Sequence, residues 1–182
     1  RAKIKQQPVS NEARPSDKLM EIIARYEKLL GVCNVKKSEH CANVIYTLGN
    51  LYYDEGRDEY IQKREEYEKA MNEYEYGKRG TEPANPLPDY SKSLSMYERL
   101  IQEYPDFSKL SEAYYQLGTI YLLKSDLYKS KKAFAHVVKK FPNSPRASAA
   151  YARLSDSTYG GQDKSRTIKY LERFREQEHA GK

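Results

Sequence analysis

The stretch SEAYYQLGTIYLLKSDLYKSKKAFAHVVKKFPNS, residues 111–144, contains the pattern that decides the fold. Tyr114, Leu117 and Tyr121 are spaced at i, i+3 and i+7, so they form one apolar stripe along a helix. A second helical segment follows a short polar turn, and Pro142 ends it because proline lacks the amide donor that a helix requires. The stretch therefore predicts a helical hairpin, and a single hairpin cannot bury that stripe alone.

The same pattern recurs along the chain. An offset of 37 residues pairs identical residues: Asp89 with Asp126, Lys92 with Lys129, Ser93 with Ser130, Pro105 with Pro142, Tyr114 with Tyr151, and Leu117 with Leu154. An offset of 69 residues pairs Leu48 with Leu117, Gly49 with Gly118, and Tyr52 with Tyr121. Internal repetition of this kind indicates a solenoid, in which stacked hairpins bury one another's apolar faces.

These residues resemble the tetratricopeptide repeat. That family places a large residue, Leu, Gly and Tyr on its first helix, and a small residue, Phe, a small-to-medium residue and Pro on its second. The copy at 111–144 satisfies all of these positions with Tyr114, Leu117, Gly118, Tyr121, Ser130, Phe134, Val137 and Pro142. The resemblance implies an all-α fold, a solenoid of helical hairpins without catalytic activity.

Two further copies flank this one. The first repeat spans 42–56 and 89–105, and its first helix carries Ile45, Leu48, Gly49 and Tyr52. A degenerate terminal repeat spans 148–178 and carries Tyr151, Leu154, Leu171 and Phe174. The terminal copy departs from the family pattern at Ser155, where Gly is expected, and at His179, where Pro is expected. Such departures suit a capping repeat.

An insertion, residues 57–88, splits the first repeat. Its first part has strong helix formers and no helix breaker, which predicts a long helix over 57–77 that projects from the repeat stack. Residues 78–88 are rich in proline and glycine and predict a return loop. Tyr60, Tyr67 and Tyr74 recur every seven residues on this helix. They form a seam that either packs against the protein's own chain or contacts a partner.

The N-terminal region divides into a leader and a helix. Residues 1–15 predict a flexible leader, and they lack the apolar core of a signal peptide. A helix is expected over 16–31, capped by Ser16 or Asp17 and ended by Gly31. Its apolar face would cover the exposed end of the first repeat.

The net charge of +6 is concentrated in the C-terminal third of the chain. Residues 124–182 contain 14 Lys and Arg against 6 Asp and Glu, a net charge of +8. The positive residues alternate with helix-spaced apolar residues, and the chain contains no recognised nucleic-acid motif. An ordinary solvated helix surface is therefore expected, and no nucleic-acid partner.

Residues that could carry catalysis or bind a metal are scarce. His40, His136 and His179 lie in unrelated segments without a second ligand at metal spacing. Phosphate-binding loops, dinucleotide fingerprints and nucleophile elbows do not occur. We therefore expect no enzymatic activity, no metal and no cofactor. Cys33 and Cys41 lie on either side of a short loop, and they form either a disulfide in an oxidising compartment or two reduced thiols.

The segments YERLIQEYPD and FAHVVKKFPNSPRASAAYARL resemble sequences in bacterial envelope members of the family. These members include the Tol-Pal coordinating protein, the lipoprotein of the outer-membrane protein assembly machinery, and repeat proteins of gliding machineries. The resemblance implies a periplasmic or outer-membrane-associated scaffold that binds a protein or peptide, with a cytoplasmic location as the alternative. Membrane association would come through a partner or through an anchor lost before Arg1. The alternative function is a structural subunit assembled through the inserted helix 57–77.

The family's concave groove gives the expected binding residues, because the first helix of each hairpin lines that groove. The positions one turn away from the buried stripes are Asn43, Tyr46, Asn50, Tyr53, Glu112, Tyr115, Thr119 and Leu122. The alternative is that these tyrosines fill the inside of a tight superhelix. A carboxylate clamp of the cochaperone type is disfavoured, because Tyr46 occupies a position where that clamp needs Lys.

Overall fold

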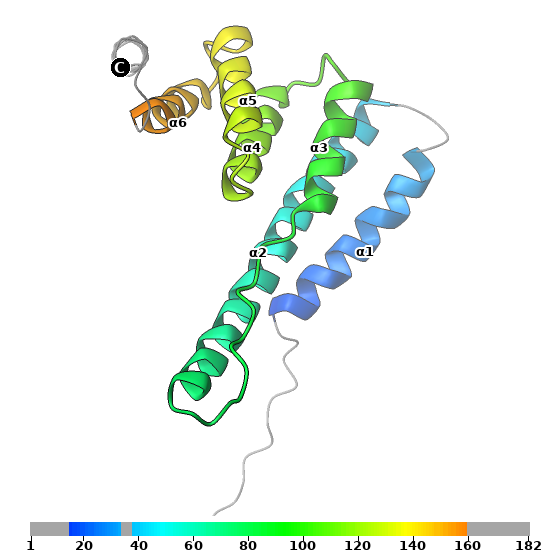
Figure 1. The fold of residues 1–182 in the computed structure, drawn as a ribbon. Helices are drawn as coiled ribbons and strands as arrows, with labels where there is room; N and C mark the ends of the chain where they lie inside the picture. Colours follow the sequence, from blue (N-terminus) through cyan, green and yellow to red (C-terminus); the bar gives the residue numbers. More distant parts are fainter. Residues whose placement is uncertain (1–14, 34–37, 160–182) are drawn as a thin grey trace, which may run out of the picture.

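The computed structural model describes residues 15–33 and 38–159, and all regular secondary structure in these ranges is α-helical (Figure 1). The helices, in chain order, are α1 (Pro15–Cys33), α2 (Glu39–Glu75), α3 (Ser91–Glu103), α4 (Leu110–Leu123), α5 (Leu127–Lys140) and α6 (Ala147–Tyr159). Each helix packs against the next one in the chain. The fold is an all-α solenoid of helical hairpins, as the sequence predicts.

The first helix of the first repeat and the inserted helix form a single helix, α2, of 37 residues. The sequence suggests two adjoining segments, 42–56 and 57–77, but Gly56 lies inside α2 without interrupting it. No proline occurs in α2, so nothing in its backbone chemistry ends the helix there. Residues 57–75, called the arm below, extend beyond α1 and α3 (Figure 1).

The proline-rich segment 78–88 returns along the arm toward α3 (Figure 1). Pro83, Pro86 and Pro88 are half-buried, and Arg64 of the arm donates a hydrogen bond to the side-chain oxygen of Asn85 at 3.2 Å. The segment re-enters the repeat beside Gly56. A Cβ atom at Gly56 would lie 2.4 Å from the carbonyl oxygen of Asp89, so only glycine permits this approach.

Each of the two complete hairpins contains an equivalent internal hydrogen bond. The Ser93 hydroxyl donates to the carbonyl oxygen of Gly49 at 2.7 Å, and the Ser130 hydroxyl donates to that of Gly118 at 2.8 Å. The paired residues are 44 apart in the first hairpin and 12 apart in the second. The difference, 32 residues, is the length of the segment 57–88. The first repeat is therefore the same unit as the second, opened at its turn by the insertion.

Three clusters of apolar side chains form the core. One joins α2, α3 and α4 and includes Tyr97, Leu100 and Ile120, which are fully buried. A second lies between α1 and α2, and a third joins α5 to α6. The stripe of one hairpin is thus covered by its neighbour, which is why the repeats are stable only as a stack.

The bounds of the first helix differ from those expected from the sequence. α1 begins at Pro15 and continues through Gly31 to Cys33, so the prediction that Gly31 ends this helix is wrong. A Cβ atom at Gly31 would meet no other atom within 4 Å, and this residue lacks the positive φ of a helix-ending glycine. The leader up to residue 14 and the second half of the terminal repeat, with Leu171, Phe174 and His179, lie outside the described residues.

Candidate functional site

The groove residues predicted on α2 are largely engaged with the rest of the first repeat. Asn43 is exposed, whereas Tyr46, Asn50 and Tyr53 are half-buried. The Tyr46 ring lies 6.4 Å from the ring of Tyr97 and 5.9 Å from that of Phe107. Asn50 accepts a hydrogen bond from the Tyr97 hydroxyl, and Tyr53 stacks on Tyr90 at 5.1 Å. These side chains therefore support the fold in addition to any contact with a partner.

The groove residues predicted on α4 are Glu112, Tyr115, Thr119 and Leu122, and all four are half-buried. The Tyr115 ring packs 5.4 Å from the ring of Phe134 on α5. The Thr119 hydroxyl donates to the backbone oxygen of Tyr115 at 3.1 Å, and Glu112 accepts from the Ser111 hydroxyl at 2.8 Å. Tyr115 is thus a partly exposed aromatic ring in this set.

Each complete repeat has a groove tyrosine with a cation above its ring. The Lys109 ammonium lies 5.3 Å from the centre of the Tyr46 ring, and the Arg146 guanidinium lies 5.3 Å from that of Tyr115. The two tyrosines are 69 residues apart and the two cations 37 apart, which are the offsets of the repeat. Both cations come from the segment that precedes the next first helix, and both are exposed. The sequence analysis did not identify these cations, although two positively charged residues at the repeat offset of 37 could have indicated them.

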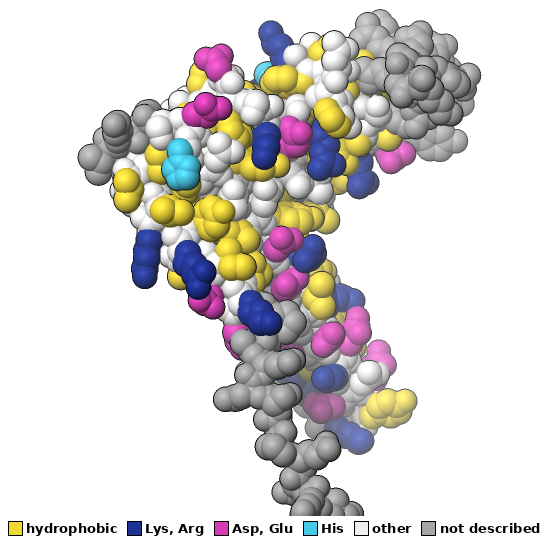
Figure 2. Space-filling model, turned by 180° about the vertical axis from the view of Figure 1, so that it is seen from behind, with side chains coloured by type: hydrophobic (Ala, Val, Ile, Leu, Met, Phe, Trp, Pro, Cys, Tyr) yellow, Lys and Arg dark blue, Asp and Glu magenta, His cyan; other side chains and the backbone are white. Residues whose placement is uncertain are grey.

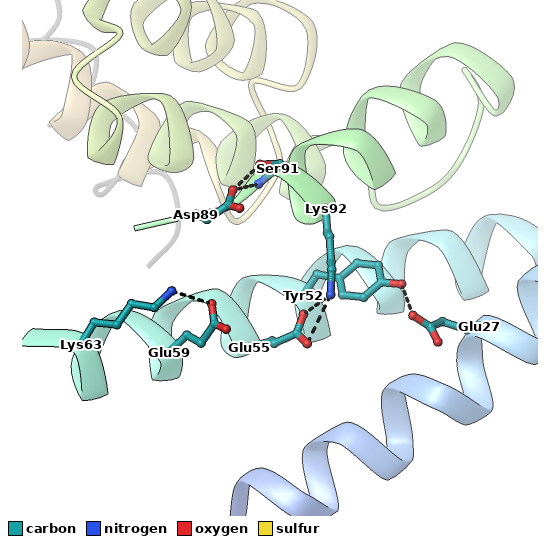
Figure 3. A network of polar contacts seen from close by, with 8 residues as sticks. All are labelled: Glu27, Tyr52, Glu55, Glu59, Lys63, Asp89, Ser91 and Lys92. Carbon is teal, nitrogen blue, oxygen red and sulfur yellow. Dashed lines mark hydrogen bonds and ion pairs between the residues drawn. The ribbon is translucent and has the colours of Figure 1, made fainter. Parts of the chain in front are cut away.

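A second repeated arrangement holds the hairpins to their neighbours, and Figure 3 shows its copy in the first repeat. The Tyr52 hydroxyl donates to Glu27 of α1 at 2.7 Å, and the Tyr121 hydroxyl donates to Glu98 of α3 at 2.8 Å. Lys92 lies over the Tyr52 ring at 5.3 Å and forms an ion pair with Glu55 at 3.2 Å. In the second repeat, Lys129 lies 5.3 Å over the Tyr121 ring and pairs with Asp126 at 3.5 Å.

These tyrosines stay protonated at physiological pH. Burial, followed by the hydrogen bond to Glu98, raises the pKa of Tyr121 to about 12. Burial, followed by the hydrogen bond to Glu27, likewise raises the pKa of Tyr52. A phenol that donates to a carboxylate gives up this bond when it ionises. The two contacts therefore act as structural joints between hairpins, and they do not titrate in the neutral range.

The tyrosine seam of the arm is only partly open. Tyr60 and Tyr67 are half-buried, whereas Tyr74 is exposed. The Arg64 guanidinium lies 5.3 Å from the centre of the Tyr67 ring and also bonds the return segment through Asn85. Acidic and basic side chains are interspersed over the surface of the arm (Figure 2). Arg64 thus links the Tyr67 ring to the return segment, and whether the seam contacts a partner stays a prediction.

Cys33 at the end of α1 and Cys41 in the first turn of α2 are joined by a disulfide. Both residues are buried in the α1–α2 cluster. Ser38 caps α2 by accepting a hydrogen bond from the Cys41 amide at 3.3 Å. The disulfide and the cap together fix the angle at which α1 turns back along α2.

Free-thiol titration of the unreduced, denatured protein is expected to find no titratable cysteine. The double change Cys33→Ser and Cys41→Ser should lower the free energy of unfolding by about 2–3 kcal/mol, because the bridge closes a short loop in the unfolded chain. Urea unfolding measures this change, and the reduced wild-type protein is the matched control, since it should lose a similar amount. Two titratable thiols in protein purified from its native compartment would contradict the prediction.

Among residues 15–33 and 38–159, no group of three or more His, Cys, Asp or Glu side chains is arranged to hold a metal ion. The ring of His136 stacks on that of Tyr114 at 3.9 Å, and burial together with nearby Lys140 lowers its pKa. No helix in the described part of the chain combines the length and the apolar character needed to cross a membrane.

A comparison with known protein families identifies one of these hairpins. Residues 112–144 match the family model described as tetratricopeptide repeat. No curated protein matches the chain in a search by sequence. The matched segment contains α5 and all but the first two residues of α4, the hairpin with the Gly118–Ser130 hydrogen bond and the Tyr114–Leu117–Tyr121 stripe. Residues 112–144 are therefore a tetratricopeptide repeat, and the chain is an all-α solenoid of the tetratricopeptide type.

Proposed function

We propose that this protein is a non-enzymatic scaffold that binds an extended, acidic segment of a partner protein along the first helices of its repeats. Tetratricopeptide repeats in general mediate protein–protein interactions. The observation that carries the proposal is the repeated pair of a tyrosine ring and an exposed cation, Tyr46 with Lys109 and Tyr115 with Arg146.

The chemistry of these pairs suits a chain with carboxylate side chains. A guanidinium or ammonium held over an aromatic ring keeps its donors directed outward, and charge-assisted hydrogen bonds to carboxylates are the strong ones. The neighbouring tyrosine edge offers apolar contact at low entropic cost. Asn43, exposed on α2, donates one amide hydrogen to the Glu39 carbonyl at 3.2 Å, and its second amide hydrogen and its oxygen can bond an extended backbone. Because the pairs recur with the repeat, they would bind a partner at regular intervals.

We further propose that the scaffold works in a bacterial envelope complex, in the periplasm or at the outer membrane. The disulfide between Cys33 and Cys41 supports this location, because such bonds persist in oxidising compartments. A structural subunit assembled through the arm is the second candidate. Its support is exposed apolar surface on the insertion, where Tyr76 at the tip of the arm is 78% and Leu87 near its base is 81% accessible to solvent.

The test removes the cations and leaves the core tyrosines in place. The variant Lys109→Ala with Arg146→Ala should bind the partner, recovered from the native host and measured by calorimetry, about tenfold or more weakly. Each charge-assisted hydrogen bond lost is worth roughly 1.5–3 kcal/mol. The matched control, Lys18→Ala with Lys28→Ala, removes two exposed lysines of α1 and should leave binding unchanged.

A third protein separates the two candidate functions. In it, residues 57–88 are deleted, so that Gly56 is followed directly by Asp89, as Ser125 is followed by Asp126 in the second hairpin. Gly49 and Ser93 are then 12 residues apart, the separation of Gly118 and Ser130, so their hydrogen bond should persist. Full binding by this protein supports the scaffold proposal. Binding that survives the loss of both cations but disappears without the arm would contradict it and support the structural subunit.

A further inference from the structure

A groove of about 370 Å³ lies on α4 and α5; its lining includes neither Tyr115 nor Arg146, but it does include Tyr121 and Lys129. It is called the α4–α5 groove below, and its lining consists of Tyr114, Leu117, Tyr121, Tyr128, Lys129, Lys132, Ala133 and His136. Part of its wall is aromatic and consists of the rings of Tyr114 and His136, which stack at 3.9 Å. Its volume lies within the range of side-chain and ligand pockets in proteins, roughly 300–1,000 Å³.

The repeat offsets show what occupies the same face in the first hairpin. Leu117, Tyr121 and Ala133 of the groove correspond to Leu48, Tyr52 and Met96. These three residues pack in the cluster that α1 completes with side chains such as Ile23, Leu19 and Tyr26. The first hairpin therefore shows the occupant of this face, an amphipathic helix that lies against it.

Contact at the second joint is less complete. α3 holds the place at α4 that α1 holds at α2: it bonds Tyr121 through Glu98 and shares an apolar cluster with Leu117 and Ala133. Its contact with α4 is, however, less extensive than that of α1 with α2. Ala133 also stands where the first hairpin has the larger Met96, so the side chain contributed by α5 fills less of this space. The remaining space is the α4–α5 groove. Beside it, Leu127 and Tyr128 are 51% and 76% exposed at the start of α5.

The charge around the groove is positive. α5 contains five lysines and no acidic residue between Leu127 and Lys140. Lys129 is partly neutralised by Asp126 at 3.5 Å, whereas Lys132 is exposed at the rim. At both joints a carboxylate of the preceding helix bonds the tyrosine, Glu27 to Tyr52 and Glu98 to Tyr121, and in the first hairpin Lys92 also pairs with Glu55. An occupant of the second groove would match it best with carboxylates beside its apolar stripe.

We propose that the α4–α5 groove binds an acidic amphipathic helix of a partner protein. The apolar side chains of that helix enter the groove between Tyr128 and His136, and its carboxylates meet Lys129 and Lys132. This site is separate from the surface assigned to the extended segment, so the scaffold would hold two different elements of a complex. A nucleic acid fits less well, because one face of Tyr114 already stacks on His136 and the floor of the groove is aliphatic.

The probe is a synthetic, fluorescein-labelled 18-residue helical peptide with Leu at i, i+3, i+4 and i+7 and Glu at the flanking positions. Fluorescence anisotropy should show saturable binding to the full chain. Tyr128→Ala with Lys132→Glu should weaken it at least tenfold, as expected for loss of an aromatic anchor together with a charge contact. Both side chains are exposed, so the fold should persist, which circular dichroism checks.

A second variant tests the shape of the groove without changing any charge. Ala133→Met introduces the side chain that the first hairpin carries at Met96, and it should weaken binding by filling the groove. Lys109→Ala with Arg146→Ala should leave binding of this probe unchanged. The ring protons of His136, followed by nuclear magnetic resonance, should shift on peptide addition.

The opposite results would overturn the inference. They are equal binding of a matched peptide with Lys in place of Glu, unchanged binding by both groove variants, or tighter binding of a single-stranded oligonucleotide in competition. Loss of binding in the Lys109 and Arg146 variant alone would also overturn it, because the peptide would then occupy the other surface.

Discussion

Replacing Tyr97 by Ala is expected to lower the free energy of unfolding by about 3–5 kcal/mol, the range measured for truncation of large buried aromatic side chains. Tyr97 is 0% exposed and packs on the backbone of Gly49, where a Cβ atom would lie 2.8 Å from the ring. Its hydroxyl donates to Asn50, and burial raises its pKa. Loss of the ring opens a cavity between α2 and α3, beside the insertion. Urea unfolding followed by circular dichroism measures the change.

The control for this prediction is Tyr97→Phe, which keeps the ring and removes only the hydroxyl. It should cost about 0.5–1.5 kcal/mol, the net value of one hydrogen bond. A loss below about 1 kcal/mol for Tyr97→Ala would mean that the first hairpin collapses around the missing ring. In that case Tyr97 would not be what holds α3 against α2.

Replacing Gly118 by Leu is expected to destabilise the protein by about 3 kcal/mol or more, at the upper end of the range for overpacked cores. A Cβ atom at Gly118 alone would lie 2.7–2.9 Å from three carbons of the Phe134 ring. Phe134 is fully buried in the cluster between α5 and α6, so its ring has no free space to move into. α4 and α5 would have to separate, which also breaks the Ser130–Gly118 hydrogen bond.

Gly31→Leu is the matched control, because Gly31 is also a helical glycine but a Cβ atom there would meet nothing within 4 Å. Leu is a better helix former than Gly by somewhat less than 1 kcal/mol, so this change should stabilise the protein slightly. The two variants share the chemical substitution and differ in the clash. If Gly118→Leu were also neutral or stabilising, the close approach of α4 and α5 would not be a requirement of the fold.

The hairpin architecture was predictable because its determinants are local. The spacing of Tyr114, Leu117 and Tyr121 and the stop at Pro142 depend only on residues within one hairpin. The insertion was predictable for the same reason, since deleting it restores the register of Gly49 with Gly118. Boundaries were less accurate. The sequence did not show that α2 runs unbroken past Gly56 or that α1 continues past Gly31.

The sequence by itself thus determined the helices, their pairing into repeats and the position of the split. Only the tertiary structure decided which tyrosines serve the core and which face outward. Tyr46 and Tyr115 occupy equivalent positions in the repeat, yet the environment of each ring depends on Phe107, Phe134 and the cations Lys109 and Arg146, which come from other segments. Helical periodicity assigns a residue to a face of its own helix, whereas burial depends on what the rest of the chain places against that face.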